Sequence, residues 1–423
     1  MTKRKILSFR INKFWSKLGP GLITGASDDD PSGIATYSQA GAQFGLATLW
    51  TALITFPLMA AVQEMCARIG IVTSKGLTSN IRSYYPKPVL YLMILFTFPA
   101  VILNIAADIA GMGAVANLIF PSIPSYFFTV GFTALLMILI IYLPYQKMAT
   151  FLKYLCIFLL LYLVVPFLSK QDWADILKHT FIPTIQLNKD FLSIIVAILG
   201  TTISPYLFFW QATMEAEDMQ HKKRRIIINK RVIQKMDRDV DLGMFFSNLV
   251  MFFIMLTTGT VLFKGGIHQI ETVEQAAKAL QPLAGNLSYL LFALGVIGTG
   301  FLAIPVLSGC LSYMLSETFG WNGSLDKKYY QAKPFYLVVI ISLLIGLAIN
   351  YTGLNPIKAL IYTAILYGVT SPVLIAIVLH ISNNKKIMGE FTNSKWSNIL
   401  GTITLISMTL CAVVLIYLQL KSD

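Results

Sequence analysis

The sequence predicts an all-α membrane protein in which two five-span halves form an inverted repeat and an eleventh span follows. Three observations predict this fold. Hydrophobic residues make up 56% of the 423 residues and charged residues only 13%, against about 45–50% and about 25% in soluble domains. Apolar runs are long enough to cross a bilayer as helices. Two of these runs are interrupted at corresponding positions in the two halves.

Eleven stretches resemble spanning helices, which need about 20 mostly apolar residues each. They are residues 20–42, 46–69, 89–118, 124–144, 149–168, 191–214, 241–263, 286–314, 336–352, 356–380 and 397–419. Such continuous runs do not match the roughly ten-residue alternating strands of a membrane barrel. We therefore predict a first repeat at residues 20–168 and a second at residues 191–380. Residues 1–19 precede the first span, and residues 397–419 form the additional one.

The distribution of basic residues predicts the orientation. If the N-terminus is cytoplasmic, the cytoplasmic segments carry 24 Lys and Arg residues and the outer segments carry 7. This asymmetry follows the positive-inside rule. We expect a multi-pass plasma-membrane protein with a cytoplasmic N-terminus and an extracellular C-terminus. The loops account for the net charge of +13, so no nucleic-acid partner is needed. The basic run at residues 222–231 is either a solvated loop or a contact with anionic headgroups.

The first interruption is a group of three acidic residues in span one. Asp28, Asp29 and Asp30 stand in mid-span, where each charge costs roughly 2.5–3.5 kcal/mol on insertion. A continuous helix would turn at least one of them toward lipid. Pro31 lacks a backbone N–H and disfavours helix at Asp30, and Gly33 permits non-helical backbone. We predict a broken helix that lines a polar cavity.

The second interruption lies in span six. A Ser204-Pro205 pair follows Thr201 and Thr202 in the middle of this otherwise apolar run. Spans one and six begin the two halves and cross the membrane in opposite directions. Paired interruptions of this kind indicate an inverted-repeat transporter with a binding site near the midplane.

The chemistry of these interruptions favours a cation. A carboxylate among freed backbone carbonyls suits Mg²⁺, Ca²⁺ or Mn²⁺. The sequence has no HExxH, GxSxG or Walker motif, so we predict neither an enzyme nor a cofactor. Asp108 lies mid-span with Asn104 one turn earlier on the same face, which favours a place along a water-filled pathway over a purely structural role. Glu64 and Arg68 have the spacing of an interfacial ion pair.

Three motifs resemble the Nramp family of divalent-metal transporters. They are Gly19-Pro20-Gly21, Asp30-Pro31-Ser32-Gly33 and the block from Thr201 to Pro205. The similarity extends over nearly the whole chain and implies a LeuT-type inverted repeat with broken helices 1 and 6. It implies metal ligands at the Asp30 carboxylate and at the carbonyls of Ser27 and Thr201.

Several positions depart from the family pattern. Gly33 and Ser204 stand where the family has Asn and Met ligands. The resemblance therefore places both in the metal site, as smaller residues than those of the family. Tyr206 replaces a His, and Gly111 replaces a Glu that follows the retained Asp108. Asp28, Asp29, Asp108 and Tyr206 are expected to line the pathway or to support the ligands.

These departures imply a change of ion. Losing the sulfur ligand removes the preference for soft metals, and the wider oxygen-lined cavity suits hydrated Mg²⁺. The pattern is similar to that of Nramp-related magnesium transporters. We therefore predict import of Mg²⁺ and Mn²⁺ by alternating access with weak or no proton coupling. The alternative is a proton-coupled Mn²⁺/Fe²⁺ importer of the usual Nramp type. A sodium-coupled amino-acid symporter and a non-transporting receptor are further readings.

The expected partners are divalent metal ions and the lipid bilayer, with no obligate protein partner. The four cysteines are scattered singly in apolar runs, so no disulfide framework is expected.

Overall fold

A computed structural model describes residues 19–143, 161–168, 171–221 and 228–421. Regular structure in these ranges is helical. The α-helices are α2 (Pro20–Asp28), α3 (Pro31–Phe44), α4 (Trp50–Thr73), α5 (Leu77–Tyr84), α6 (Lys87–Ile119), α7 (Ser125–Tyr142), α9 (Leu161–Leu168), α10 (Trp173–Phe181), α11 (Lys189–Thr202), α12 (Pro205–His221), α13 (Lys230–Thr258), α14 (Val273–Ala277), α15 (Gln281–Ala284), α16 (Ser288–Phe319), α17 (Lys333–Ile349), α18 (Pro356–Asn383), α19 (Lys385–Met388) and α20 (Lys395–Lys421).

Nine helical segments within the described ranges are long and apolar enough to cross a membrane, with α11 and α12 together counted as one. The predicted first span is divided into α2 and α3, of 9 and 14 residues. The predicted fifth span, residues 149–168, lies outside the described residues except for α9. An all-helical, multi-pass architecture is therefore established, and the count of eleven spans remains a prediction.

Helix ends differ from the predicted ones where polar residues extend a helix beyond the apolar run. The predicted seventh span begins at residue 241, but α13 begins at Lys230. The Asn229 side chain caps this helix by accepting from the backbone N–H groups of Arg231 and Val232 at 3.0 and 3.1 Å. Hydropathy alone misses this start, because a capped helix tolerates charged residues outside the membrane.

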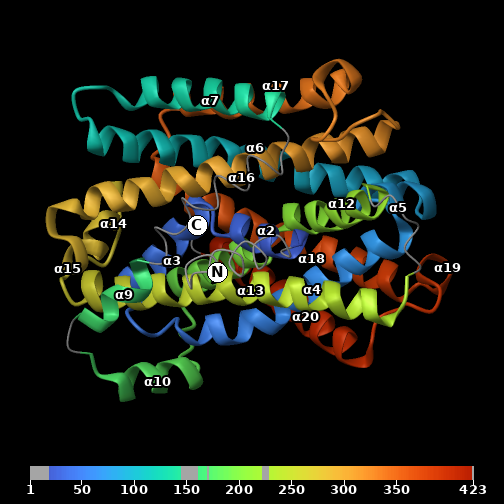
Figure 1. Ribbon diagram of the computed structural model, residues 1–423. Helices are drawn as coiled ribbons and strands as arrows, with labels where there is room; N and C mark the ends of the chain where they lie inside the picture. Colours follow the sequence, from blue (N-terminus) through green and yellow to red (C-terminus); the bar gives the residue numbers. More distant parts are fainter. Residues whose placement is uncertain (1–18, 144–160, 169–170, 222–227, 422–423) are drawn as a thin grey trace, which may run out of the picture.

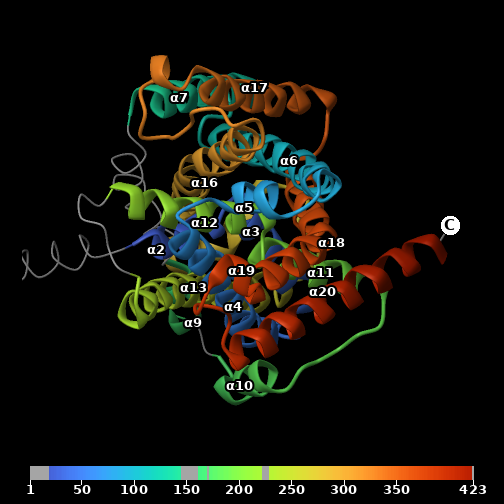
Figure 2. The ribbon, with the colours of Figure 1, turned by 90° about the vertical axis from the view of Figure 1, so that its right-hand side faces the viewer.

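The helices form layers (Figure 1). α7 and α17 pack together along one side, and α6 and α16 lie beneath them. The middle of the molecule holds α2, α3, α11, α12 and α18 together with α4 and α13. On the far side, α20 packs across α18, α11 and α4 (Figure 2). The two interrupted spans are thus enclosed by other helices, as charged mid-membrane residues require.

Helix α2 crosses α13 at backbone contact. A Cβ added to Gly25 would lie 2.3 Å from the carbonyl oxygen of Gly243. One added to Gly243 would lie 2.2 Å from the carbonyl oxygen of Gly21. Asp239 of α13 also accepts from the backbone N–H groups of Gly19 and Gly21, both at 2.8 Å. Small residues at this spacing let two membrane helices approach closely, which holds the acidic end of α2 against α13.

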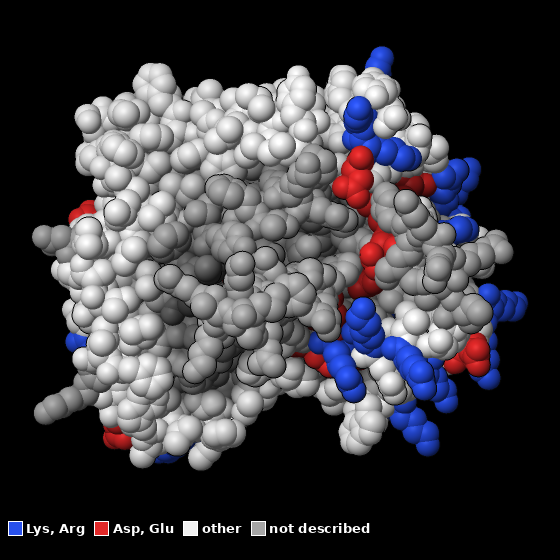
Figure 3. Space-filling view, in the orientation of Figure 1, with Lys and Arg blue, Asp and Glu red and all other residues white. Residues whose placement is uncertain are grey.

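Charged side chains gather at one end of the molecule (Figure 3). On the face shown, Lys and Arg with interspersed acids lie at the end where α5 and the C-terminal end of α12 are found. The opposite end of this face carries few charges.

Candidate metal site

Asp30 connects α2 to α3. Helix α2 ends at Asp28, and α3 begins at Pro31. Asp30 is the N-cap of α3, and its Oδ1 accepts from the Gly33 backbone N–H at 2.7 Å. A proline at the first helical position and an acidic cap are the residues that favour starting a helix here. The interruption therefore follows from local sequence.

The second Asp30 oxygen is held by another helix. Asn104 Nδ2 of α6 donates to Asp30 Oδ2 at 2.9 Å, and Asn104 Oδ1 accepts from Thr363 Oγ1 of α18 at 3.1 Å. Ser32 Oγ donates to the Leu360 carbonyl at 2.7 Å. Asn104 is fully buried, and Asp30 is 2% exposed. The sequence analysis placed Asn104 on the face of Asp108 but did not foresee its contact with Asp30, since α6 and α3 meet only in the fold.

The second interruption lies between α11, which ends at Thr202, and α12, which begins at Pro205. The Ser204 hydroxyl is directed back to α11, where the carbonyls of Gly200 and Thr201 accept from it at 3.0 and 2.6 Å. Ser371 of α18 donates to the Ile203 carbonyl at 3.0 Å. Side-chain hydroxyls thus satisfy the carbonyls freed where the helix stops.

The two interruptions adjoin each other. The Tyr206 hydroxyl donates to the Ser27 carbonyl at 3.1 Å. A Cβ at Gly33 would lie 3.4 Å from Thr201 Oγ1 and 3.3 Å from the Asp28 carbonyl oxygen. The fold therefore brings together the six residues that the sequence analysis assigned to spans one and six: Ser27, Asp30, Gly33, Thr201, Ser204 and Tyr206. All of them are buried. We call this set the junction.

Asp28 and Asp29 face α13. The Ser247 hydroxyl lies 2.7 Å from Asp28 Oδ2 and 3.3 Å from Asp29 Oδ1. The two side chains are 0% and 4% exposed, and Asp28 Oδ1 has no hydrogen-bond partner among the described residues. One hydroxyl cannot neutralise two buried carboxylates, so this region favours a cation or bound protons. The sequence analysis did not identify Ser247 as a partner of these acids. Its only mark in the sequence is that it is a serine inside an apolar run.

Asp108 lies close to the junction. It is fully buried, and neither carboxylate oxygen has a hydrogen-bond partner in the part of the chain that the structure describes. It lies one helical turn after Asn104 on α6, and the Asn104 amide donates to Asp30. Gly111 borders a small cavity of about 10 Å³ whose other walls include Pro31 and Leu360. Gly111 has no side chain, at the position where the resemblance implies a Glu.

A polar path leaves the junction along α2 and α12. Thr24 Oγ1 of α2 donates to Gln211 Oε1 at 2.5 Å, and Gln211 Nε2 donates to Glu215 Oε1 at 3.1 Å. These contacts follow α12 toward its C-terminal end, which lies at the charged end of the molecule (Figures 1 and 3). Glu215 directly follows the predicted sixth span, residues 191–214, and Gln211 joins it to α2.

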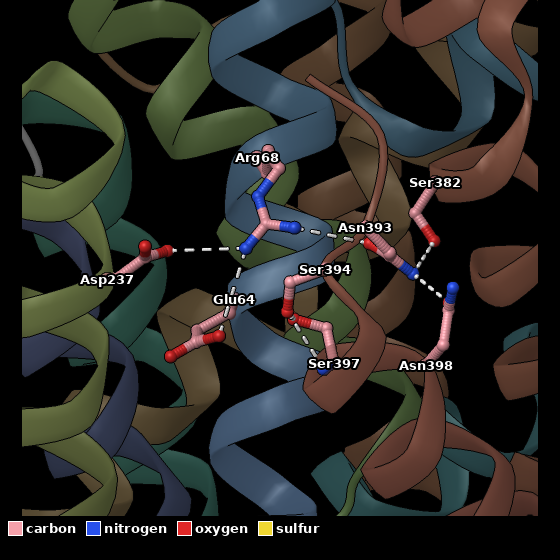
Figure 4. A network of polar contacts seen from close by, with 8 residues as sticks. All are labelled: Glu64, Arg68, Asp237, Ser382, Asn393, Ser394, Ser397 and Asn398. Atoms are coloured by element: carbon pink, nitrogen blue, oxygen red, sulfur yellow. Dashed lines mark hydrogen bonds and ion pairs between the residues drawn. The ribbon is translucent and has the colours of Figure 1, made fainter. Parts of the chain in front are cut away.

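Arg68 connects three parts of the chain near the same end (Figure 4). Its guanidinium lies 3.9 Å from Glu64 Oε2 and 3.5 Å from Asp237 Oδ1 of α13. It also donates to Asn393 Oδ1, between α19 and α20, at 3.3 Å. Asn393 in turn donates to Ser382 at 2.8 Å. The pair predicted between Glu64 and Arg68 is thus one side of a larger, partly buried network.

The junction presents oxygen atoms, the kind of ligand that hard divalent ions prefer. They are the Asp30 carboxylate, the carbonyls of Ser27 and Thr201, and nearby hydroxyls. Among the described residues, the ion pairs involve Arg68 and His179, and none includes a junction residue. The negative charge is therefore not neutralised by a basic side chain of these regions, and an anion would be repelled.

Comparisons with known proteins found similar sequences over nearly the whole chain. The family described as natural resistance-associated macrophage protein-like (Nramp) matches residues 21–418. A divalent metal cation transporter MntH of Caldanaerobacter subterraneus subsp. tengcongensis is 25% identical over 423 residues, covering 100% of this chain and 97% of its own length. MntH of Clostridium acetobutylicum is 26% identical over 405 residues, covering 95% and 90%.

Solved structures share the fold. The Eremococcus coleocola manganese transporter superposes with a TM-score of 0.75 at 19% identity, covering 95% of this chain and 87% of that one. Mhp1, a nucleobase-cation-symport-1 family transporter, superposes with a TM-score of 0.56 at 12% identity, covering 95% and 92%.

Proposed function

We infer that this chain, which belongs to the Nramp family, carries divalent metal ions across a membrane. The curated relatives described above are divalent metal cation transporters, and they match nearly the full chain. As a member of this family, the chain is not an enzyme, and no cofactor is indicated for it. The ion is its substrate.

The observation that carries the proposal is the buried Asp30 carboxylate at the point where two interrupted helices adjoin. Asp30 would bind the ion together with the carbonyls of Ser27 and Thr201. Tyr206 donates to the first of these carbonyls and Ser204 to the second. A carbonyl oxygen has two lone pairs, so each carbonyl can keep this hydrogen bond and offer its second lone pair to the ion.

We further propose that the preferred ions are Mg²⁺ and Mn²⁺. Gly33 offers no side chain, and the Ser204 hydroxyl is turned back to α11. Neither position supplies a soft ligand, and neither adds a bulky side chain to the junction. Mg²⁺ dehydrates reluctantly and usually keeps several waters, so an oxygen-only site with small residues favours it.

Transport would proceed by alternating access. The junction residues are buried, so the ion reaches them only after helices separate on one side. Residues 20–168 and 191–380 would be the inverted repeats that move relative to each other, with residues 397–419 as an added span. The charged end in Figure 3 supports a cytoplasmic location for that end, because Lys and Arg concentrate inside. This orientation gives a cytoplasmic N-terminus in the plasma membrane and an extracellular C-terminus.

Proton coupling is expected to be weak or absent, because Tyr206 and Gly111 stand where the family has a His and a Glu. The second candidate, a proton-coupled Mn²⁺/Fe²⁺ importer, is favoured by one observation. Asp108 is buried near Asp30 without a hydrogen-bond partner among the described residues, and such a group can hold a proton.

The test is uptake into liposomes that contain the purified protein, with and without an imposed pH gradient. We expect accumulation of Mg²⁺ and Mn²⁺ that the gradient changes little. Absence of uptake of either ion by folded protein contradicts metal transport. Uptake of Mn²⁺ but not Mg²⁺, driven by an inward proton gradient, favours the second candidate.

A further inference from the structure

The Asn104 side chain lies between Asp30 and α18 in a defined orientation. Its Nδ2 is 2.9 Å from Asp30 Oδ2, and its Oδ1 is 3.1 Å from Thr363 Oγ1. An ionised carboxylate can only accept hydrogen bonds, so the amide presents its NH₂ group to Asp30 and its oxygen to Thr363. The exposed fractions of Asn104, Asp30 and Thr363 are 0%, 2% and 4%, so solvent does not compete for these bonds.

We infer that Asn104 is a positioning residue that determines how Asp30 meets the ion, and through it the preference for Mg²⁺. The inference rests on the proposed function. Both Asp30 oxygens already accept one N–H each, from Gly33 and from Asn104. The plane of the carboxylate is therefore held from two sides, by α3 and by α6.

This arrangement restricts the ion's coordination. A carboxylate whose two oxygens are each engaged by a donor is poorly placed to chelate an ion with both oxygens. It can still offer one oxygen, or accept from a water of the ion. Mg²⁺ is usually held through one or two carboxylates while keeping several waters. Without the amide, Asp30 would be free to turn and to bind a less hydrated ion such as Mn²⁺ more directly.

Thr363 makes the orientation of Asn104 specific. Its hydroxyl also lies 2.8 Å from the Leu360 carbonyl and 3.2 Å from Ser32 Oγ, which itself donates to Leu360. Thr363 thus joins α18, on which it lies, to the hydrogen-bond network around α3. Its contact with the Asn104 amide oxygen makes it the second position to test.

The experiment compares Asn104→Leu with Asn248→Leu. Leucine has the same branched arrangement of side-chain heavy atoms as asparagine but no amide. Asn248 is a matched control, because it is also buried (5% exposed) and contacts Thr55 and Met244 rather than Asp30. In liposomes, Asn104→Leu should raise the KM for Mg²⁺ by about tenfold, the lower end of what loss of a ligand-orienting partner costs. The KM for Mn²⁺ should change much less, and maximal rates should be kept.

A second pair of variants guards against misfolding. Thr363→Val should raise the KM for Mg²⁺ by a smaller factor, and Thr363→Ser, which keeps the hydroxyl, should restore it. Thr363→Val added to Asn104→Leu should have no further effect, because the two act as one unit.

Equal rises in KM for both ions, or an Asn104→Leu protein that behaves like Asn248→Leu, would overturn the inference while leaving metal transport intact. If the unaltered protein takes up neither ion, the proposed function itself fails, and the inference fails with it.

Discussion

Asp30 is the residue on which the proposed metal site depends. Asp30→Ala should reduce uptake of Mg²⁺ and Mn²⁺ to background, because it removes the only carboxylate that caps α3 at the junction. The protein should still fold, since the variant also removes a mid-membrane charge that costs roughly 2.5–3.5 kcal/mol on insertion. Calorimetry on purified protein measures the affinity, and Asp190→Ala, at an exposed acid, is the control. Unchanged affinity in a folded Asp30→Ala protein would remove Asp30 from the site.

Gly33 and Ser204 are the residues expected to tune the choice of ion. Gly33→Asn with Ser204→Met adds an amide and a sulfur to the junction, where a Cβ at Gly33 has 3.3–3.4 Å to its neighbours. Uptake of Mg²⁺ should fall while uptake of Mn²⁺ or Cd²⁺ is kept or rises, because size and ligand softness both act against Mg²⁺. Gly33→Ala with Ser204→Ala controls for the removed hydroxyl and added bulk. A parallel response of Mg²⁺ and Cd²⁺ would show that softness and size do not separate them.

At the scale of elements, the crossing of α2 and α13 leaves no room for a side chain. Gly243→Ala places a Cβ 2.2 Å from the Gly21 carbonyl oxygen, so the helices must separate. We expect a loss of about 1–3 kcal/mol in stability, as for overpacking in a core, together with reduced uptake. The measurement is thermal unfolding in detergent. Gly131→Ala on α7 is the control, because nothing lies within 4 Å of its added Cβ, and equal melting temperatures of the two variants would contradict the prediction.

Arg68 joins α4, α13 and the segment before α20. Arg68→Met should destabilise the protein by about 1–3 kcal/mol, because it leaves Asp237, Glu64 and Asn393 without their shared donor. Arg238→Met, at an exposed position of the same helix α13, should change stability little. Comparing the two by unfolding in detergent separates the network from the general loss of a positive charge.

At the scale of the whole molecule, the chain is expected to move metal with little proton movement. A coupled carrier needs a group on its path that titrates near neutral pH, and Tyr206 keeps its proton throughout that range. Intraliposomal pH, read with a dye during Mg²⁺ or Mn²⁺ influx, should stay constant once the membrane potential is clamped. Acidification that accompanies metal entry and disappears in Asp108→Asn would contradict this prediction and show that the protein is a proton-coupled transporter.

The sequence by itself determined the class of fold and the place of both interruptions. Composition predicted a multi-pass helical membrane protein, and nine spanning segments in the described residues confirm that class. Pro31 and Pro205 act through local backbone chemistry, so α2 and α11 end where the sequence predicted a break. The resemblance to the Nramp family is confirmed by the match over residues 21–418. The magnesium preference and the roles of the site residues remain predictions.

Only the tertiary structure decided which side chains complete the junction. Asn104 contacts Asp30, and Ser247 contacts Asp28, each across 74 or more residues of sequence. Thr363 reaches Asp30 through Asn104. No local pattern marks such partners, because a buried polar residue is equally compatible with several neighbours until helices pack. Helix breaks are set by the chain's own dihedral preferences, whereas partners are set by which faces meet.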